Sequence, residues 1–261
     1  ACSDLEIVFA RGSGEAPGLG ITGTPLVSDV KSALSSASVS SYAVDYAASY
    51  DQTSAGPGAT DMSNHIKSTA AACPDTKFAI GGYSQGASVT DIAIGIRTYL
   101  GTGQTIPTEL APRVVAVIAF GNPLGLYGQT IKTASPTYGP KSLEFCNRGD
   151  NVCGGTGTGP GYGHLSYARD GSVDQAAAFI AKQYNASAGT PTTPTPTPTP
   201  TPVPTTCVRD STRDHVAADR AVSLYGRAYA RGSRDSLGAT SSYNVVSLQQ
   251  VEGGWRLVTA C

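Results

Sequence analysis

Ser84 lies at the centre of the segment Gly-Tyr-Ser-Gln-Gly, residues 82–86. The apolar run 78–81 before it predicts a strand, and the composition of 87–100 after it predicts a helix. A serine at such a sharp strand-to-helix turn has a strained backbone and needs small neighbours, and its hydroxyl stands clear of the sheet. The alternative is an ordinary glycine-rich turn with an incidental serine. The flanking strand and helix favour a nucleophile.

A serine hydroxyl needs a general base, and the chain offers three histidines. His65 lies within an expected helix ahead of the serine and is interpreted as a helix-surface residue, while His215 lies in a separate C-terminal segment. His164 follows the last expected strand, in the glycine-rich stretch 161–166. Hydrolases on a doubly wound sheet carry their residues in the order serine, acid, histidine, and only His164 fits that order.

The acid must then lie between Ser84 and His164, at the carboxyl end of a strand. The candidates are Asp91, Glu109, Glu144 and Asp150. Asp91 falls within the helix after the serine, Glu109 precedes a strand, and Glu144 lies inside one. Asp150 directly follows the last expected strand, so the sequence favours it as the residue that orients His164.

Asp150 also ends the tripeptide Arg-Gly-Asp, residues 148–150, which is the pattern of an adhesion motif displayed to a partner protein. Cys146 and Cys153 flank this tripeptide. A disulfide between them would hold the carboxylate rigidly enough to orient an imidazole. Because a serine and a histidine accompany Asp150 in the required order, the sequence favours catalysis over adhesion.

Two further groups are expected to stabilise an oxyanion. The backbone N–H of Gln85, the residue after the nucleophile, is one donor. Ser13 follows the expected strand 5–10 directly and can offer both a backbone N–H and a hydroxyl. Residues expected to line the substrate cleft are Tyr83, Leu165, Val152 and Asn122, although leucine and valine there could equally be core residues.

Short apolar runs and helical segments alternate over the first part of the chain. Strands are expected at 5–10, 42–46, 77–81, 113–120 and 142–145, and helices at 23–37, 59–72, 85–99 and 172–184. The helix at 59–72 is expected to begin at Thr60 or Asp61 as its N-cap. This alternation predicts an α/β fold with a parallel sheet covered on both faces, whose ligands bind beyond the carboxyl ends of the strands.

The Pro/Thr-rich stretch 189–206 divides the chain. Its regularly spaced prolines exclude helix and sheet, so it is expected to be an extended polyproline-II linker. It separates a catalytic domain at 1–188 from a small module at 207–261, which is expected to bind polymer. In that module 215–228 is expected to be a helix, and 245–258 a hairpin that turns at Gly253 and Gly254.

The composition excludes several classes of protein. The net charge is −1, no basic run is present, and no stretch approaches the ~18 apolar residues of a membrane span, so neither nucleic-acid binding nor membrane insertion is expected. The chain starts at Ala1 without an apolar leader, which predicts a mature secreted form.

The cysteines support secretion. All six, at positions 2, 73, 146, 153, 207 and 261, lack the spacing of a metal site. Although 15 pairings are conceivable, placement favours Cys146–Cys153 and Cys207–Cys261, which leaves Cys2–Cys73.

Taken together, "ARGSGE", "GYSQG", "CNRGDNVC" and "GHLSY" resemble the cutinase family of secreted serine esterases over most of 1–188. The resemblance implies an α/β-hydrolase core of three layers with a five-stranded parallel sheet and an active site without a lid. It implies Ser84, Asp150 and His164 as the catalytic triad, Ser13 and Gln85 as oxyanion donors, and the bridges Cys2–Cys73 and Cys146–Cys153.

The activity implied is hydrolysis of insoluble polyesters such as cutin and of short-to-medium acyl esters, by a monomer that needs no cofactor or metal. An acetylxylan esterase with a carbohydrate-anchoring tail is the alternative within enzymes, and a non-catalytic adhesion protein the alternative outside them. The module at 207–261 is similar to one appended to some poly(3-hydroxybutyrate) depolymerases.

Overall fold

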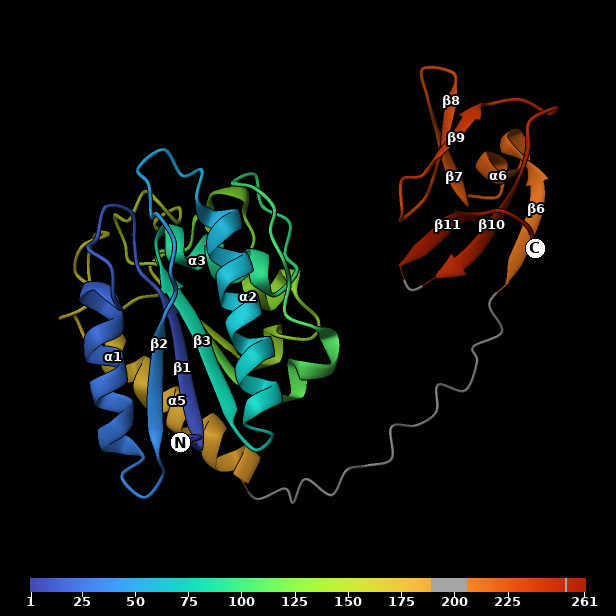
Figure 1. Cartoon of the computed structure of the whole chain (residues 1–261). Coiled ribbons are helices and arrows are strands. Elements are labelled where there is room, and N and C mark those ends of the chain that lie inside the picture. The colour runs from blue at the N-terminus through green and yellow to red at the C-terminus, as the bar shows by residue number, and fades with distance from the viewer. Residues whose placement is uncertain (189–205, 252) are drawn as a thin grey trace. The chain divides into compact units, whose positions relative to one another are not determined.

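The computed structural model describes residues 1–188, 206–251 and 253–261. The chain divides into two compact units, Ala1–Pro191 and Thr192–Cys261 (Figure 1). Apart from Thr206, the expected linker at 189–206 lies outside the described residues. Each unit is therefore described by itself.

A five-stranded parallel sheet forms the centre of the first unit (Figure 1). Its strands are β1 (Leu5–Ala10), β2 (Val39–Ala43), β3 (Lys77–Tyr83), β4 (Val114–Phe120) and β5 (Ser142–Phe145), in the order β2-β1-β3-β4-β5. Successive side chains of a strand point to opposite faces. In β1, Ile7 and Phe9 accordingly join one core cluster and Val8 joins the other. Both faces of the sheet are buried, which confirms the predicted fold class.

Helices cover both faces of this sheet (Figure 1). The helices are α1 (Gly20–Ala33) and α5 (Ser172–Ala188) on one face, and α2 (Ala55–Ala72) and α3 (Gln85–Ala93) on the other. Short elements follow α3 and β4: η1 (Thr108–Arg113), η2 (Pro123–Tyr127), α4 (Ile131–Ala134) and η3 (Gly139–Lys141). The result is a three-layer architecture with the carboxyl ends of all five strands at one edge.

Several helix boundaries differ from expectation. α1 spans Gly20–Ala33 rather than 23–37, and α5 spans Ser172–Ala188 rather than 172–184. α2 begins at Ala55 rather than near Thr60, because Gly56 and Gly58 serve in close packing and not in a loop. A Cβ on Gly56 would lie 2.1 Å from the carbonyl oxygen of Thr102, and one on Gly58 would meet Val89 and Tyr46. α3 ends at Ala93 rather than near 99, and Gly95 with φ +86° follows its end. The weak strand expected at 42–46 is β2, three residues earlier.

The second unit is mainly β-structure. Its elements are β6 (Cys207–Ser211), α6 (Thr212–Ala217), β7 (Ala221–Leu224), β8 (Arg227–Ala230), β9 (Ser236–Ala239), β10 (Val245–Val251) and β11 (Gly254–Val258). They form two antiparallel sheets of three strands each, ordered β11-β10-β6 and β7-β8-β9. A small cluster that includes Leu237 and Leu248 forms the core, with Trp255 partly buried against it.

The helix expected at 215–228 is wrong. α6 ends at Ala217, and β7 and β8 form a hairpin that turns at Tyr225 and Gly226, both with positive φ. The alternating pattern of 221–230 therefore belongs to strands. The hairpin expected at 245–258 is present, but Val251 pairs with Gly254, so its turn is one residue earlier than expected.

Three disulfides link Cys2 to Cys73, Cys146 to Cys153 and Cys207 to Cys261, the pairing that placement favoured. The third bridge ties the first strand of the second unit to the last residue of the chain. Over the described residues, none of the helices has both the length and the apolar character to cross a membrane.

Candidate active site

Ser84 lies between β3 and α3, in a conformation that glycine would normally take (φ +58°, ψ −119°). Gly82 and Gly86, two residues before and after Ser84, make this turn sterically feasible. A Cβ on Gly82 would lie 2.0 Å from the carbonyl oxygen of Gly86, and a Cβ on Gly86 would lie 2.0 Å from that of Ala10. The backbone N–H of Ser84 donates to Phe120 at the end of β4. The turn thus projects the hydroxyl beyond the carboxyl edge of the sheet.

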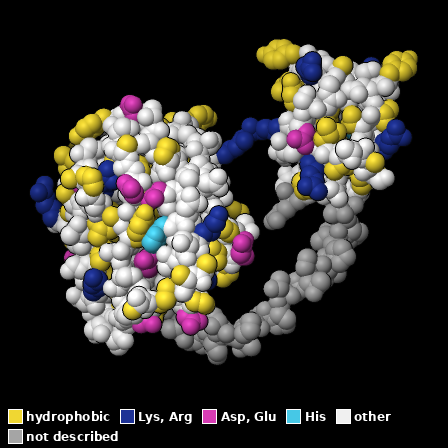
Figure 2. All heavy atoms as spheres, in the orientation of Figure 1, with side chains coloured by type: hydrophobic (Ala, Val, Ile, Leu, Met, Phe, Trp, Pro, Cys, Tyr) yellow, Lys and Arg dark blue, Asp and Glu magenta, His cyan; other side chains and the backbone are white. Residues whose placement is uncertain are grey.

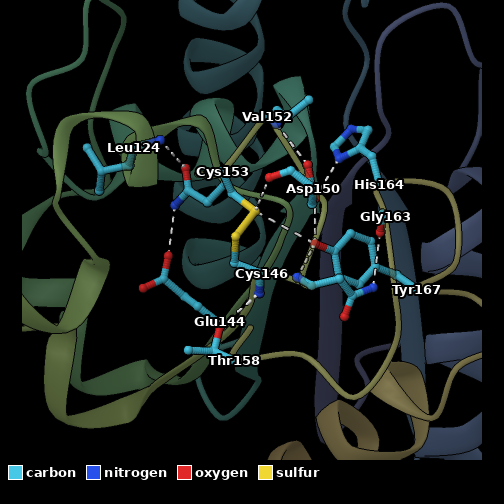
Figure 3. The surroundings of a disulfide bond; sticks show 12 residues. Leu124, Glu144, Cys146, Asp150, Val152, Cys153, Thr158, Gly163, His164 and Tyr167 are labelled. Atoms are coloured by element: carbon cyan, nitrogen blue, oxygen red, sulfur yellow. Dashed lines mark hydrogen bonds and ion pairs between the residues drawn. A yellow bond between two sulfur atoms is a disulfide. The ribbon is translucent and has the colours of Figure 1, made fainter. Parts of the chain in front are cut away.

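Ser84, His164 and Asp150 form one continuous hydrogen-bonded chain. Ser84 Oγ lies 2.9 Å from His164 Nε2. His164 Nδ1 lies 2.8 Å from Asp150 Oδ2, a contact that Figure 3 shows. An ionised carboxylate only accepts hydrogen bonds, so Nδ1 carries the proton and Nε2 is free to accept one from Ser84. The three residues therefore have the connectivity and the tautomer that activate a serine.

The loop between Cys146 and Cys153 carries Asp150 into the protein interior. Asp150 is fully buried, whereas Arg148 is exposed. A tripeptide whose acid is fully buried cannot be displayed to a partner, so the adhesion interpretation is wrong. Burial by itself would raise the pKa of Asp150, but hydrogen bonds from His164 and Tyr167 outweigh burial and hold that pKa below its ordinary value.

Asn147, in the same disulfide loop, fixes the position of the histidine loop. Its Nδ2 donates to the carbonyl of Gly163 and to the side chains of Ser166 and Asp170, and its Oδ1 accepts the N–H of Gly161. Asn147 is fully buried. One side chain, which the sequence analysis did not identify, thus joins the loop that carries Asp150 to the loop that carries His164.

Gly121, directly after β4, allows the imidazole to approach. A Cβ there would lie 2.7 Å from His164 Cε1 and 2.9 Å from Asp150 Oδ2, and its φ of +60° favours glycine as well. In the sequence, Gly121 is marked only by its place directly after the apolar run 113–120.

Gln85, the residue after Ser84, is hydrogen-bonded to Ser13. Gln85 is the first residue of α3, so its backbone N–H has no partner within the helix. Its side-chain amide donates to Ser13 Oγ at 2.8 Å and to the carbonyl of Ser49, and accepts from Ser54. A second amide, that of Gln52, also donates to Ser13 Oγ at 2.8 Å.

Because both amides donate to Ser13 Oγ, its two lone pairs are occupied and its own hydrogen is free to donate elsewhere. Gln52 was missed by the sequence analysis. It has φ +64° and lies in the loop after β2, where no local pattern marks it.

Two of the four residues expected to line the cleft do not do so. Leu165 is 71% exposed and Val152 is half-buried, so both are accessible enough to contact a substrate. Tyr83 is buried instead; its ring stacks on His164 and its hydroxyl donates to the His164 carbonyl at 2.8 Å. Asn122 is also buried, and its amide is bound within the protein.

Asn122 bridges the buried carboxyl of Asp91 and the half-buried carboxyl of Glu144, both of which the sequence analysis considered as the catalytic acid. Its Nδ2 donates to Asp91 and to Glu144, each at 2.9 Å. Burial raises the pKa of both carboxyls, and that of Asp91 lies well above its ordinary value. In the structure neither group hydrogen-bonds to His164, which leaves Asp150 as its carboxylate partner.

The other two histidines are bound elsewhere. His65 on α2 stacks on Tyr42 and lies 2.6 Å from Glu6, so it is half-buried against β1 and β2 rather than a free surface residue. His215 is buried in the second unit, between Arg220 and the carbonyl of Val246. No group of three or more His, Cys, Asp or Glu suited to a metal ion occurs within the described ranges.

Comparison with known proteins identifies the family. The sequence profile described as Cutinase matches residues 1–184. A protein of Kineococcus radiotolerans named "Cutinase" is 71% identical over 263 residues, which span 100% of this chain and 88% of that protein. A Mycobacterium tuberculosis protein named "Probable carboxylesterase Culp3" is 39% identical over 191 residues, 72% of this chain and 71% of that one.

Among solved structures, a Trichoderma reesei cutinase in complex with a phosphonate inhibitor superposes with a TM-score of 0.54 at 31% identity. The match covers 70% of this chain and 77% of that structure. The profile match, the identity to named cutinases and the shared fold agree with one another. This chain therefore belongs to the cutinase family and is a carboxylic ester hydrolase.

Proposed function

We propose that the protein hydrolyses esters through an acyl-enzyme, with Ser84 as nucleophile, His164 as base and Asp150 as the orienting acid. The observation that supports this most directly is the hydrogen-bonded chain from Ser84 Oγ through both ring nitrogens of His164 to Asp150 Oδ2. In this arrangement the histidine can take the serine proton, and the carboxylate holds the histidine in the required tautomer.

In the proposed reaction, Ser84 Oγ attacks the ester carbonyl carbon while His164 Nε2 takes the hydroxyl proton. The tetrahedral oxyanion accepts hydrogen bonds from the backbone N–H of Gln85 and the hydroxyl of Ser13, each donor contributing about 10²–10³ in rate. His164 then protonates the leaving alcohol. Water attacks the acyl-enzyme by the same route in reverse, which releases the acid and restores Ser84.

The proposed substrates are insoluble polyesters such as cutin, together with short-to-medium acyl esters. Exposure of the site supports this: Leu165 beside the histidine is 71% exposed, and Tyr50, which packs over Gly14 next to Ser13, is 80% exposed. Apolar side chains that are solvent-accessible around a nucleophile suit an acyl chain within a solid surface.

An acetylxylan esterase is the second candidate, and acyl-chain preference separates the two. We expect p-nitrophenyl butyrate to be hydrolysed at least as well as the acetate, and release of soluble acids from a polyester film. Strong preference for acetate, together with release of acetate from acetylated xylan and no attack on the film, would favour the alternative.

The test of the proposed chemistry is Ser84→Ala, with Ser88→Ala as the matched control. Ser88 lies one turn further along the chain, within α3, and is fully buried, whereas Ser84 is half-buried. Ser84→Ala should remain folded and lose esterase activity, and the control should retain it. A phosphonate should label Ser84 alone, as judged by peptide mass spectrometry. Labelling of another residue, or activity in Ser84→Ala, would contradict the proposal.

We also propose that the protein is secreted, acts as a monomer, and uses its second unit to adsorb to solid polymer. Three disulfides suit an oxidising compartment. Residues 207–261 carry seven arginines and no lysine, and Figure 2 shows basic and apolar side chains on the visible face of this unit. Tyr225 and Tyr243 in the second unit are both exposed and offer flat apolar faces. Adsorption would raise the local concentration of the catalytic unit at the surface.

A further inference from the structure

Tyr167 lies three residues after His164 in the same loop and is 1% exposed. Three aromatic rings surround its own: Phe120 at 5.9 Å, Tyr83 at 6.1 Å and the imidazole of His164 at 6.3 Å between ring centroids. The orientation of the phenol is thereby fixed by packing. The mechanism proposed above assigns it no role.

The hydrogen bonds of the Tyr167 hydroxyl have a definite direction. Its oxygen accepts the backbone N–H of Asn147 at 3.0 Å, so the single hydroxyl hydrogen must point to a different partner. Asp150 Oδ2 lies 2.5 Å away, whereas Cys153 Sγ, a weak acceptor, lies 3.8 Å away. Tyr167 therefore donates to Asp150, as Figure 3 shows.

Tyr167 and His164 thus donate to the same oxygen atom. Asp150 Oδ2 accepts both the phenol and the imidazole Nδ1–H, while Oδ1 accepts the backbone N–H of Val152 at 2.9 Å. Donation by a phenol withdraws negative charge from Oδ2, which is the charge that stabilises a protonated imidazole. In a buried site this withdrawal counts for more than it would in water.

We propose that Tyr167 is a positioning residue of the catalytic site: its hydroxyl holds Asp150 Oδ2 toward His164 and limits the negative charge that the carboxylate presents to the imidazole. This inference rests on the roles proposed above for Ser84, His164 and Asp150. It assigns to Tyr167 a contribution to the pH at which His164 becomes available as a base.

The titratable and charged groups that surround His164 can be named. From β3, Tyr83 stacks its ring on the imidazole, and its hydroxyl donates to the backbone carbonyl of His164. Burial, and then the charge of Glu15 in the loop after β1, raise the pKa of Tyr83, and Tyr83→Phe retains the stacked ring. Directly after β4, Gly121 lies against the imidazole and carries no charge. In the histidine loop, Asp170 is bound by Asn147, Ser166 and Ser172. Asp150 is itself the only carboxylate that hydrogen-bonds His164 in the structure.

The first test is the pH profile of kcat/KM for Tyr167→Phe, with Tyr83→Phe as the matched control. Both variants lose one buried phenol hydroxyl from the same aromatic cluster, but only Tyr167 donates to Asp150. Without the phenol, Oδ2 stabilises the protonated imidazole more strongly, so the acid limb should move to higher pH by about 0.5–1 unit. The control should leave the acid limb within about 0.2 units of the wild type.

The plateau values add a second readout. In Tyr167→Phe we expect kcat to fall by about three- to tenfold while KM changes less than about twofold, because Asp150 loses an anchor and the substrate loses no contact. If the substitution only destabilised the protein, less active enzyme would be present, but the acid limb of the kcat/KM profile would stay at the same pH.

Tyr167→Phe also leaves the N–H of Asn147 without an acceptor, so a substitution that keeps the hydroxyl is needed in addition. Replacing Tyr167 by 2,3-difluorotyrosine makes the phenol a stronger donor. The acid limb should then move in the opposite direction, to lower pH by about 0.2–0.5 units.

Opposite shifts in the two variants would establish the proposal. An acid limb that stays in place in the fluorinated enzyme, or that moves as far in Tyr83→Phe as in Tyr167→Phe, would overturn it. Failure of the underlying mechanism gives a different result, since Ser84→Ala would then remain active or the phosphonate would label another residue.

Discussion

The unit that carries Ser84 packs a parallel sheet between two helical layers, whereas the second unit packs two small antiparallel sheets with a single short helix. In the first, large side chains such as Phe9, Phe78 and Phe120 are fully buried on either side of the sheet. In the second, the buried apolar residues are mostly alanines, with Leu237 and Leu248 as the largest.

This difference in core size indicates how many polar groups each unit can bury. A large core can enclose polar groups at a cost in stability, and the first unit buries Asp150, Asp91 and Asn147. Among the described residues of the second unit no carboxyl is buried, and a disulfide joins its two ends. Small domains commonly need such a covalent link because their cores contribute little. We therefore expect chemistry and pH sensitivity in the first unit, and dependence on its disulfide in the second.

The largest expected effect is that of Asp150→Asn, which should lower kcat on a soluble butyrate ester by about 10⁴ with little change in Tm. An amide in place of the carboxylate favours the wrong imidazole tautomer and cannot balance its positive charge. Arg148→Ala, in the same loop but exposed, is the control and should keep kcat within about tenfold. If both substitutions lowered kcat equally strongly, the proposal that Asp150 alone of this tripeptide takes part in catalysis would be wrong.

A second prediction concerns the Cys207–Cys261 bridge. Replacing both cysteines by serine should destabilise the second unit by about 4 kcal/mol, because the bridge closes a segment with a separation of 54 residues. The chain's only tryptophan, Trp255, lies in β11, so its fluorescence reports unfolding of this unit alone. Activity on soluble esters should be unchanged. A fluorescence transition that does not move would contradict the idea that this small core depends on the bridge.

Removal of the second unit should have a smaller, selective effect. A protein that ends at Ala188 should keep its kcat on soluble butyrate esters and adsorb several-fold less to polyester films, because every residue of the proposed mechanism lies before 170. Adsorption is measured by depletion of protein from solution, with Ser84→Ala in both lengths so that the film is not degraded. Loss of soluble-ester activity, or unchanged depletion, would show that the two units do not divide the work in this way.

The smallest effect concerns the pH dependence of stability. Burial holds the pKa of Asp91 well above its ordinary value, with the nearby charge of Glu144 acting in the same direction. The stability associated with the protonated form is fully present below about pH 4, the carboxyl pKa of an unfolded chain, and is lost as pH rises through the raised pKa of the folded state. Asp91→Asn should therefore lessen the fall of Tm between pH 4 and pH 8 by about 3 °C or more.

Asp75→Asn, at an exposed position, is the control for that measurement and should leave the slope unchanged. The transition reported by Trp255 should not respond to either substitution. If the second unit lost stability with rising pH as steeply as the first, the contrast drawn above from buried carboxyls would be wrong.

The proposed catalytic residues and the central sheet could be identified from the sequence because their signals are local or follow chain order. Ser84 is marked by two glycines between a strand and a helix, and His164 by its place after the last strand. The network around them was not predictable. Asn147, Gln52 and Tyr167 act through partners that folding brings in from other loops, and nothing in their immediate sequence distinguishes them from ordinary loop residues.

The errors have physical causes of the same kind. Asn122 looked like a cleft residue from its place after β4, yet two carboxyls from α3 and β5 bind its amide inside the protein. The segment 215–228 has an apolar face at helical spacing, but the turn at Tyr225 and Gly226 and pairing between β7 and β8 override it. In a small unit, where strand pairing supplies much of the structure, helical periodicity alone is a weak guide.

The backbone of Ser84 has a consequence for how this enzyme can be improved. A non-glycine residue at φ +58° and ψ −119° carries a conformational cost of roughly 1–3 kcal/mol, which glycine would relieve. Selection for thermal stability alone would therefore favour loss of the proposed nucleophile, and we expect a Ser84→Gly protein to be inactive but more stable than the enzyme from which it came. Stabilised variants sought by directed evolution should be screened for turnover as well as for Tm, since at this one position the two requirements oppose each other.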